Sequence, residues 1–240
     1  MQHELLQTNL TLDEAENLQE KYSQKLKIQE YNIQKISDIK GIKWVVGVDV
    51  SYYKESHEEG GVACAVLWNL LLNKMDSHSF AKGIITFPYK PGFLGFRECN
   101  LLTKAIKNLP ETPDIIICDG HGIIHPKRFG EAVQLGLILN IPTFGVAKKP
   151  FIGFSEWKTL IRKKGNKKPI WADDPQNSIV VNNERLGYAV CLNDGMKPMF
   201  VSGGYKTTLD VAVKIALRTA KNHKQPEPLF LADYLSRKEL

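Results

Sequence analysis

The sequence predicts an α/β fold: a mixed sheet with three antiparallel strands first and parallel strands after, flanked by helices. Two observations indicate this class. Three strand-like runs in the first part of the chain are separated by short gaps, and short gaps imply antiparallel neighbours. Helical segments then alternate with short apolar strands, as in a buried parallel sheet. The length of 240 residues suits one domain over residues 1–240.

The elements follow in a clear order along the chain. Residues 1–30 are expected to form a helix that packs on the domain, because Thr11 to Glu14 resembles a capping box and helical spacing continues to about Lys27. The strand-like runs cover residues 43–53, 62–72 and 77–87. The alternating part comprises a helix at 96–109, a strand at 114–118, a helix at 127–139 and a strand at 142–147.

The last third is predicted to add strands and end in helices. A lysine-rich loop is expected at residues 162–168. Three strand candidates lie at 178–181, 187–192 and 199–202, followed by a helix at 208–222 and a last helical turn around Asp233.

Composition and charge narrow the class of partner. The net charge of +6 favours a polyanionic partner such as nucleic acid. Four cysteines occur without a C-x-x-C pair, which favours reduced, buried thiols over a zinc site. The N-terminus does not have the basic and apolar regions of a signal peptide, and the longest apolar run is too short to cross a bilayer. We therefore expect a cytoplasmic protein without membrane contact.

Two aspartates are the first candidates for chemistry. Asp49 lies within the apolar run 45–50, where a carboxylate is costly unless it is paired or bound to a metal; the alternative is a solvated strand face. Asp119 ends an apolar strand and precedes a glycine-rich, cationic loop, which suits binding of a phosphate or a base edge. The alternative for Asp119 is a simple Asp-Gly turn.

Two further carboxylates could join them. Glu98 lies on or beside the buried face of its helix, although a place near a helix N-terminus is favourable in itself. Asp233 stands among apolar neighbours, with a surface aspartate as the alternative. Carboxylates that converge from separate elements repel one another unless divalent cations neutralise them, and two such ions can promote phosphodiester hydrolysis.

The run at residues 87–96 is stiffened by Pro88 and Pro91 and carries Tyr89 between them. A stiff loop with an aromatic tip can act as a wedge between bases. The alternative is a strand-to-helix connection whose aromatic side chains fill the core.

Five blocks of the sequence together resemble the endonuclease V family. They are GVDVSY (47–52), PYKPGFLGFRE (88–98), DGHGIIHPKRFG (119–130), IPTFGVAKKP (141–150) and PEPLFLAD (226–233). The blocks fall in the family's order and cover most of the chain. The resemblance implies an RNase H-like fold, which agrees with the predicted order of elements.

The resemblance also implies roles for individual residues. The metal-binding carboxylates would be Asp49, Glu98, Asp119 and Asp233, with Mg²⁺ as the cofactor and Mn²⁺ as a substitute. His125 and Lys148 match a histidine and a lysine that serve catalysis. The wedge would comprise Pro88, Tyr89, Lys90 and Pro91. The inosine pocket would be lined by Leu94, Gly120, Gly122, Gly130 and Gly145.

The function implied is that of a DNA repair endonuclease. Such an enzyme hydrolyses the second phosphodiester bond 3′ to deoxyinosine, which is deaminated adenine, and leaves 3′-hydroxyl and 5′-phosphate ends. The expected partner is DNA containing deoxyinosine, and the expected state is a monomer. Two alternatives stay open: an endoribonuclease acting on inosine in RNA, and a catalytically weak protein that binds inosine or nucleic acid.

Some positions depart from the family's pattern. Tyr205 follows Gly203-Gly204 where the family often has a histidine, which puts the rate or its pH profile in doubt. Lys127 replaces the usual arginine and loses its two-pronged donor geometry. Gln134 replaces a histidine. The basic loop at 162–168 suggests either an extra backbone contact or a solvated loop.

Overall fold

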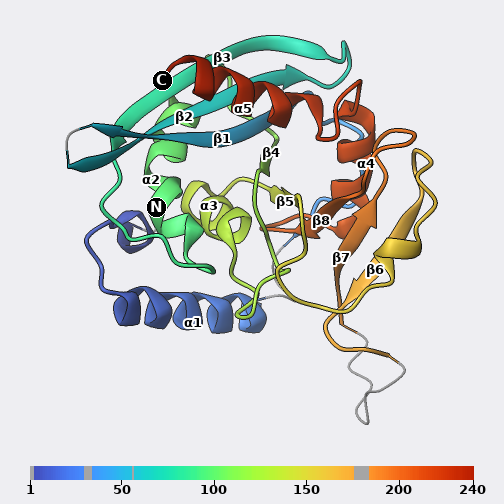
Figure 1. Cartoon of the computed structure of the whole chain (residues 1–240), viewed down its shortest axis with the longest axis horizontal. Coiled ribbons are helices and arrows are strands. Elements are labelled where there is room, and N and C mark those ends of the chain that lie inside the picture. Colours follow the sequence, from blue (N-terminus) through green and yellow to red (C-terminus); the bar gives the residue numbers. More distant parts are fainter. Residues whose placement is uncertain (1–2, 30–33, 56, 176–183) are drawn as a thin grey trace.

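A mixed sheet organises the chain, in the strand order β3-β2-β1-β4-β5-β8-β7-β6 (Figure 1). The computed structural model describes residues 3–29, 34–55, 57–175 and 184–240. None of the helices within these ranges is long and apolar enough to cross a bilayer. The predicted α/β class with a mixed sheet and flanking helices is confirmed.

The first three strands form the predicted antiparallel meander. They are β1 (Trp44–Glu55), β2 (Glu58–Asn69) and β3 (Lys74–Ile84). β1 and β2 pair along their whole length, and β2 and β3 pair with one irregularity between Leu67 and Trp68. The alternation of valines in β1 sends Val46, Val48 and Val50 into the core beneath α2 (Leu94–Lys107) and α3 (Glu131–Leu139).

The parallel part is shorter than predicted. β4 (Ile115–Cys118) pairs parallel with β1, and β5 (Thr143–Ala147) pairs parallel with β4. The next strands are β6 (Lys167–Trp171), β7 (Arg185–Val190) and β8 (Met199–Gly203). They add to β5 in antiparallel fashion. Parallel pairing therefore ends at β5, because these strands follow one another without a crossover helix.

One predicted loop is in part a strand. Residues 167 and 168 of the lysine-rich segment belong to β6, which lies at the edge of the sheet. Ile170 is buried there while Lys167 is exposed. An edge position also tolerates Pro169. The strand candidate at 178–181 lies outside the described residues.

Helices cover both faces of the sheet. α2 and α3 pack on one face, and α4 (Leu209–Thr219) and α5 (Glu227–Lys238) contribute to the core on the other. α3 begins at Glu131 rather than 127, because residues 121–130 form an irregular loop that ends at the N-cap Gly130. α5 is a full helix rather than a last turn. Figure 1 shows α1 (Leu12–Gln29) on the side of the molecule away from β1, β2 and β3.

Two short 3-10 helices complete the structure, at His3–Leu6 and Trp157–Thr159. Buried Ala15 and Tyr22 fix α1 to the core beneath α2 and α3. Of the segment 1–30, for which a packing helix was expected, α1 covers residues 12–29.

Candidate active site

Three aspartates line one open cleft of about 470 Å³, together with Lys148 and Arg237. The register explains why Asp49 and Asp119 meet there. Val48 on β1 pairs with Cys118 on β4. The next residues, Asp49 and Asp119, therefore lie side by side on neighbouring segments of the sheet. Asp233 reaches the same cleft from α5.

Gly47 allows α5 to approach β1. A Cβ atom on Gly47 would lie 2.3 Å from the backbone carbon of Pro228, which is closer than side-chain carbons come to other atoms. Gly47 and Asp49 are on the same face of the strand because their positions differ by two. The glycine therefore lets α5 lie directly over the strand face from which Asp49 projects.

Burial and like charges dominate the electrostatics of the cleft. Burial, followed by the charges of Asp119, Glu98 and Asp233, raises the pKa of Asp49 to about 9. Burial also raises the pKa of Asp119, although Lys148 opposes that shift. The Lys148 ammonium lies 3.0 Å from Asp119 Oδ2 and is half exposed. Arg237 also borders the cleft and lies 2.7 Å from Asp233 Oδ1.

Glu98 approaches from the other layer, just after the first turn of α2. Its carboxylate accepts a hydrogen bond from the Tyr52 hydroxyl. Burial raises the pKa of Glu98 to about 7, and hydrogen bonds from Glu131 and then Tyr52 offset part of that rise. Glu131 on α3 lies beside it, and burial followed by the Glu98 charge raises the Glu131 pKa well above its ordinary value.

This donor set fits a hard divalent cation. Carboxylate oxygens are the preferred ligands of such ions, and the raised pKa values of Asp49 and Glu98 indicate that burial and mutual repulsion outweigh the nearby cationic side chains. Within the described segments, no three His, Cys, Asp or Glu side chains already close around a single cation position. Mutual repulsion gives carboxylates a physical reason to stay apart until a cation joins them.

A second pocket, of about 240 Å³, lies between the loop at 88–93, the loop at 120–130 and residues 149–151. Tyr89 stands at this pocket with 74% of its surface exposed. The predicted pocket residues Leu94, Gly120 and Gly130 line it. Gly145 packs behind the wall, where a Cβ atom would lie 2.5 Å from Gly120 O. Gly122 similarly packs against Gly203 O.

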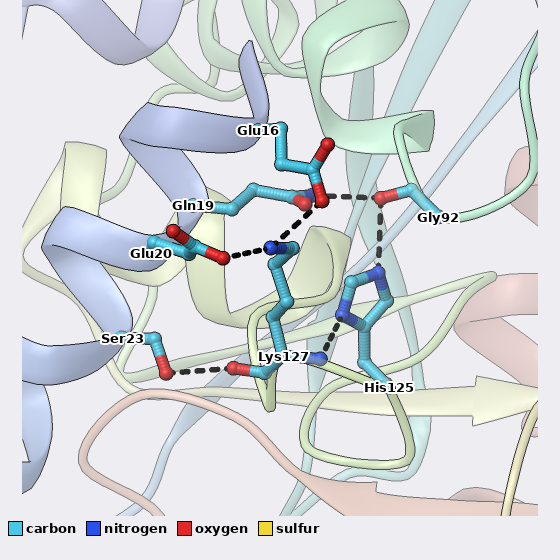
Figure 2. Close-up of polar contacts among 7 residues, drawn as sticks. All are labelled: Glu16, Gln19, Glu20, Ser23, Gly92, His125 and Lys127. Atoms are coloured by element: carbon cyan, nitrogen blue, oxygen red, sulfur yellow. Dashed lines mark hydrogen bonds and ion pairs between the residues drawn. The ribbon is translucent and has the colours of Figure 1, made fainter. Parts of the chain in front are cut away.

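His125 lies at this second pocket and not among the residues that line the acidic cleft. Its Nδ1 accepts a hydrogen bond from the Lys127 backbone N–H at 3.2 Å. The proton is therefore on Nε2, which donates to Gly92 O at 2.9 Å (Figure 2). Burial lowers the pKa of His125, so the ring is neutral.

The chain matches the family model described as Endonuclease V over residues 20–234. It belongs to the endonuclease V family. Endonuclease V of Dictyoglomus thermophilum is 36% identical over 96% of this chain and 92% of its own length. The crystal structure of the Streptomyces avermitilis endonuclease V is similar at a TM-score of 0.82 and 32% identity, covering 97% of this chain and 94% of that chain.

A third relative is informative about ligands. Endonuclease V of Ciona intestinalis is 30% identical, with a TM-score of 0.80, and covers 96% of this chain and 98% of its own. Its crystal structure is a complex with a 23mer DNA containing an inosine followed by a ribo-adenosine. Membership of the endonuclease V family makes the present chain a nuclease, a hydrolase.

Each residue that departs from the endonuclease V pattern has defined contacts in the structure. Lys127 pairs with Glu16 and Glu20 of α1, so its ammonium is already neutralised. Gln134 donates to Leu5 O and is buried. The Tyr205 hydroxyl donates to Asn140 Oδ1 at 3.1 Å, and Tyr205 is not among the residues that line the acidic cleft.

Sequence reasoning missed three polar neighbours of the carboxylates. Tyr52 hydrogen-bonds Glu98, Gln225 donates to Asp119 Oδ2 at 3.4 Å, and Glu131 lies beside Glu98. Tyr52 could have been noticed because it lies three residues after Asp49 in the same block. Glu131 was hidden by its position in a first helical turn, where an acidic residue is ordinary.

Proposed function

We propose that this endonuclease V family member is a divalent-metal-dependent repair enzyme that hydrolyses the second phosphodiester bond 3′ to deoxyinosine in DNA. The products carry 3′-hydroxyl and 5′-phosphate ends. The observation that carries the proposal is the cleft in which Asp49, Asp119 and Asp233 meet beside Lys148. The proposed setting is the cytoplasm, and the proposed active species is a monomer.

The acidic cleft is the proposed reaction centre. Asp49, Asp119 and Asp233 would hold the cation, with Glu98 next to them. A bound Mg²⁺, or Mn²⁺ in its place, supplies Lewis acidity toward the phosphate and a more acidic water. The cation would also satisfy the carboxylates whose charged forms burial and repulsion disfavour.

The second pocket is the proposed site of the lesion base. Deaminated adenine pairs weakly and leaves the stack at low cost. Tyr89 is exposed and stands on a loop between two prolines, which suits a side chain that fills the space left by the base. The glycines at 120 and 130 let main chain come close to a base edge.

Hydrolysis adds the oxygen of water to phosphorus while the bond from phosphorus to the 3′ oxygen breaks. The water gives up one proton, and the departing 3′ oxygen gains one. The Lys148 ammonium borders the cleft and would stabilise the negative charge that develops on the phosphate. His125 is turned toward Gly92 in the second pocket, so a direct role at the phosphate would require its ring to move.

Inosine in RNA is the second candidate substrate. The DNA bound by the Ciona intestinalis relative carries a ribo-adenosine directly after the inosine. A 2′-hydroxyl at that position is therefore compatible with binding to one member of the family. Contacts to the 2′-hydroxyl are what allow a protein to tell RNA from DNA.

Matched oligonucleotides test the proposal. Deoxyinosine DNA, inosine RNA and adenine controls of the same sequence would be incubated with Mg²⁺, with Mn²⁺ and with chelator. We expect a metal-dependent nick at the second bond 3′ to deoxyinosine. Asp49→Ala and Asp119→Ala should abolish cutting and keep binding, because they remove cation ligands and leave the second pocket intact.

Each other outcome has a definite meaning. Cutting of the RNA alone would transfer the function to inosine-containing RNA. Tight inosine binding without cutting would identify a binding protein. Tyr205→His would then be the first variant to test for restored cutting. Full cutting by either aspartate variant in Mg²⁺ would overturn the assignment of the acidic cleft.

A further inference from the structure

The loop that carries Tyr89 is held at both ends by buried side chains. Arg97 donates to Phe87 O just before the loop. Gly92 O, at its other end, accepts two hydrogen bonds: one from Gln19 Nε2 at 2.7 Å and one from His125 Nε2 at 2.9 Å. The exposed Tyr89 therefore projects from between two fixed carbonyl groups.

Gln19, Gly92, His125 and Lys127 form what we term the Gly92 network (Figure 2). Gln19 and His125 are 2% and 4% exposed, so water competes little for these bonds. The His125 ring uses both nitrogens, so it cannot rotate without losing two bonds. Gly92 has a φ of 91°, a backbone conformation that favours glycine, so other residue types would be strained at this turn.

Helix α1 holds the other side of the network. The Lys127 ammonium lies 2.9 Å from Glu16 Oε1 and also pairs with Glu20, and the Ser23 hydroxyl donates to Lys127 O at 2.7 Å. Residues 16, 19, 20 and 23 share one face of the helix because they are spaced by three and four. One helical face thus contacts both loops that border the second pocket.

We propose that α1 is a positioning element for this nuclease, in which Gln19 and Lys127 fix the Tyr89 loop against the loop at 120–130 and thereby set the affinity for the flipped base. This inference rests on the proposed function. Gln19 is a positioning residue: it contacts Gly92 and not the acidic cleft. The matched family region begins at residue 20, so nothing in that match assigns a role to Gln19.

Two variants of Gln19 separate a lost hydrogen bond from a lost side chain. Gln19→Ala removes the whole amide, whereas Gln19→Met keeps a similar size and removes the donor. Gln24→Ala is the matched control, because Gln24 is an exposed glutamine on the same helix. We expect both Gln19 variants to raise KM for deoxyinosine DNA by about five-fold, the effect of one lost hydrogen bond. The rate at saturation should stay close to that of the unaltered protein, since the carboxylates are untouched.

Amide hydrogen exchange provides a readout that needs no substrate. In both Gln19 variants, exchange should become faster in peptides covering 87–93 and 125–128 and stay unchanged in the strands. Gln24→Ala should match the unaltered protein in both measurements. Faster exchange throughout the domain would indicate general destabilisation and would contradict a local role.

The outcomes distinguish this inference from the proposed function. Unchanged KM in both Gln19 variants, or a loss confined to kcat, would overturn the positioning role while leaving the nuclease assignment intact. If the unaltered protein cuts no inosine substrate, the proposed function fails first. Unchanged exchange at 87–93 would then overturn the attachment by α1 as well.

Discussion

At the scale of single residues, the unusual feature is a group of acidic side chains placed where water is scarce. Burial is the largest cause of the raised pKa at Asp49, Glu98, Asp119 and Glu131, and neighbouring carboxylates add to it. Asp49 and Asp119 line the proposed cation site, and Glu98 lies next to it. A bound cation would stabilise the charged forms of all three. Glu131 differs, because it lies outside the cleft and shares a hydrogen bond with the Glu98 carboxyl, which requires a proton on one of the two groups.

Removing the Glu131 carboxyl should therefore destabilise the fold. Glu131→Leu keeps a similar volume but leaves the buried Glu98 carboxyl with one hydrogen bond fewer, so we expect the free energy of unfolding to fall by about 1–3 kcal/mol in chelator. Urea denaturation measures this change. Glu111→Leu at an exposed position is the control and should be close to neutral. A gain of stability in Glu131→Leu would mean that the two carboxyl groups do not stabilise each other.

At the scale of elements, the decisive pieces are the loops and helices that present side chains to the two pockets. The Tyr89 loop is fixed at Phe87 and Gly92 and exposed in between. Such a loop can meet nucleic acid without first becoming ordered, which lowers the entropic cost of binding. Gly47 has the comparable role for α5, because it permits the approach that brings Asp233 over β1.

The Tyr89 loop can be tested without disturbing the fold. Tyr89→Ala removes a side chain that is 74% exposed, so the midpoint of thermal unfolding should stay unchanged. Loss of base stacking should lower kcat/KM for deoxyinosine DNA by about ten-fold. Leu71→Ala, a change at an equally exposed apolar residue, should alter neither quantity. Undiminished cutting by Tyr89→Ala would rule out the wedge role.

At the scale of the whole molecule, folding and cation binding are coupled through the acidic cleft. The folded protein holds a proton on Asp49 up to a pKa of about 9, against an ordinary value of 3.8. Between these two values the folded state binds more protons than the unfolded state. The free energy of unfolding in chelator must then fall as the pH rises through this interval.

We expect urea denaturation in chelator at pH 5, 7 and 9 to show this decline, and Mg²⁺ to reverse much of it at pH 9. Asp49→Asn should reduce the slope, because it removes one of the groups whose pKa is raised in the folded state. Asp76→Asn changes an exposed aspartate in β3 and should leave the slope as it is. A stability that rises with pH in chelator would show that the carboxylates are not held against their charge.

Local sequence patterns are sufficient to predict the elements whose burial repeats with a short period. The antiparallel meander follows from alternating valines and short turns, and β4 follows from an apolar run that Asp119 ends. The family blocks identified residues that now lie around two pockets. Local patterns succeed here because side-chain direction repeats every two residues in a strand.

Which of these residues meet depends on long-range packing. The register of β1 against β4 placed Asp49 beside Asp119, and the approach of α5 at Gly47 added Asp233. Long-range packing also placed His125 at the second pocket and paired Lys127 with α1. It made β6, β7 and β8 antiparallel to one another. The physical reason is that such contacts join residues far apart in the chain, and their partners depend on strand order and helix packing, which no local pattern specifies.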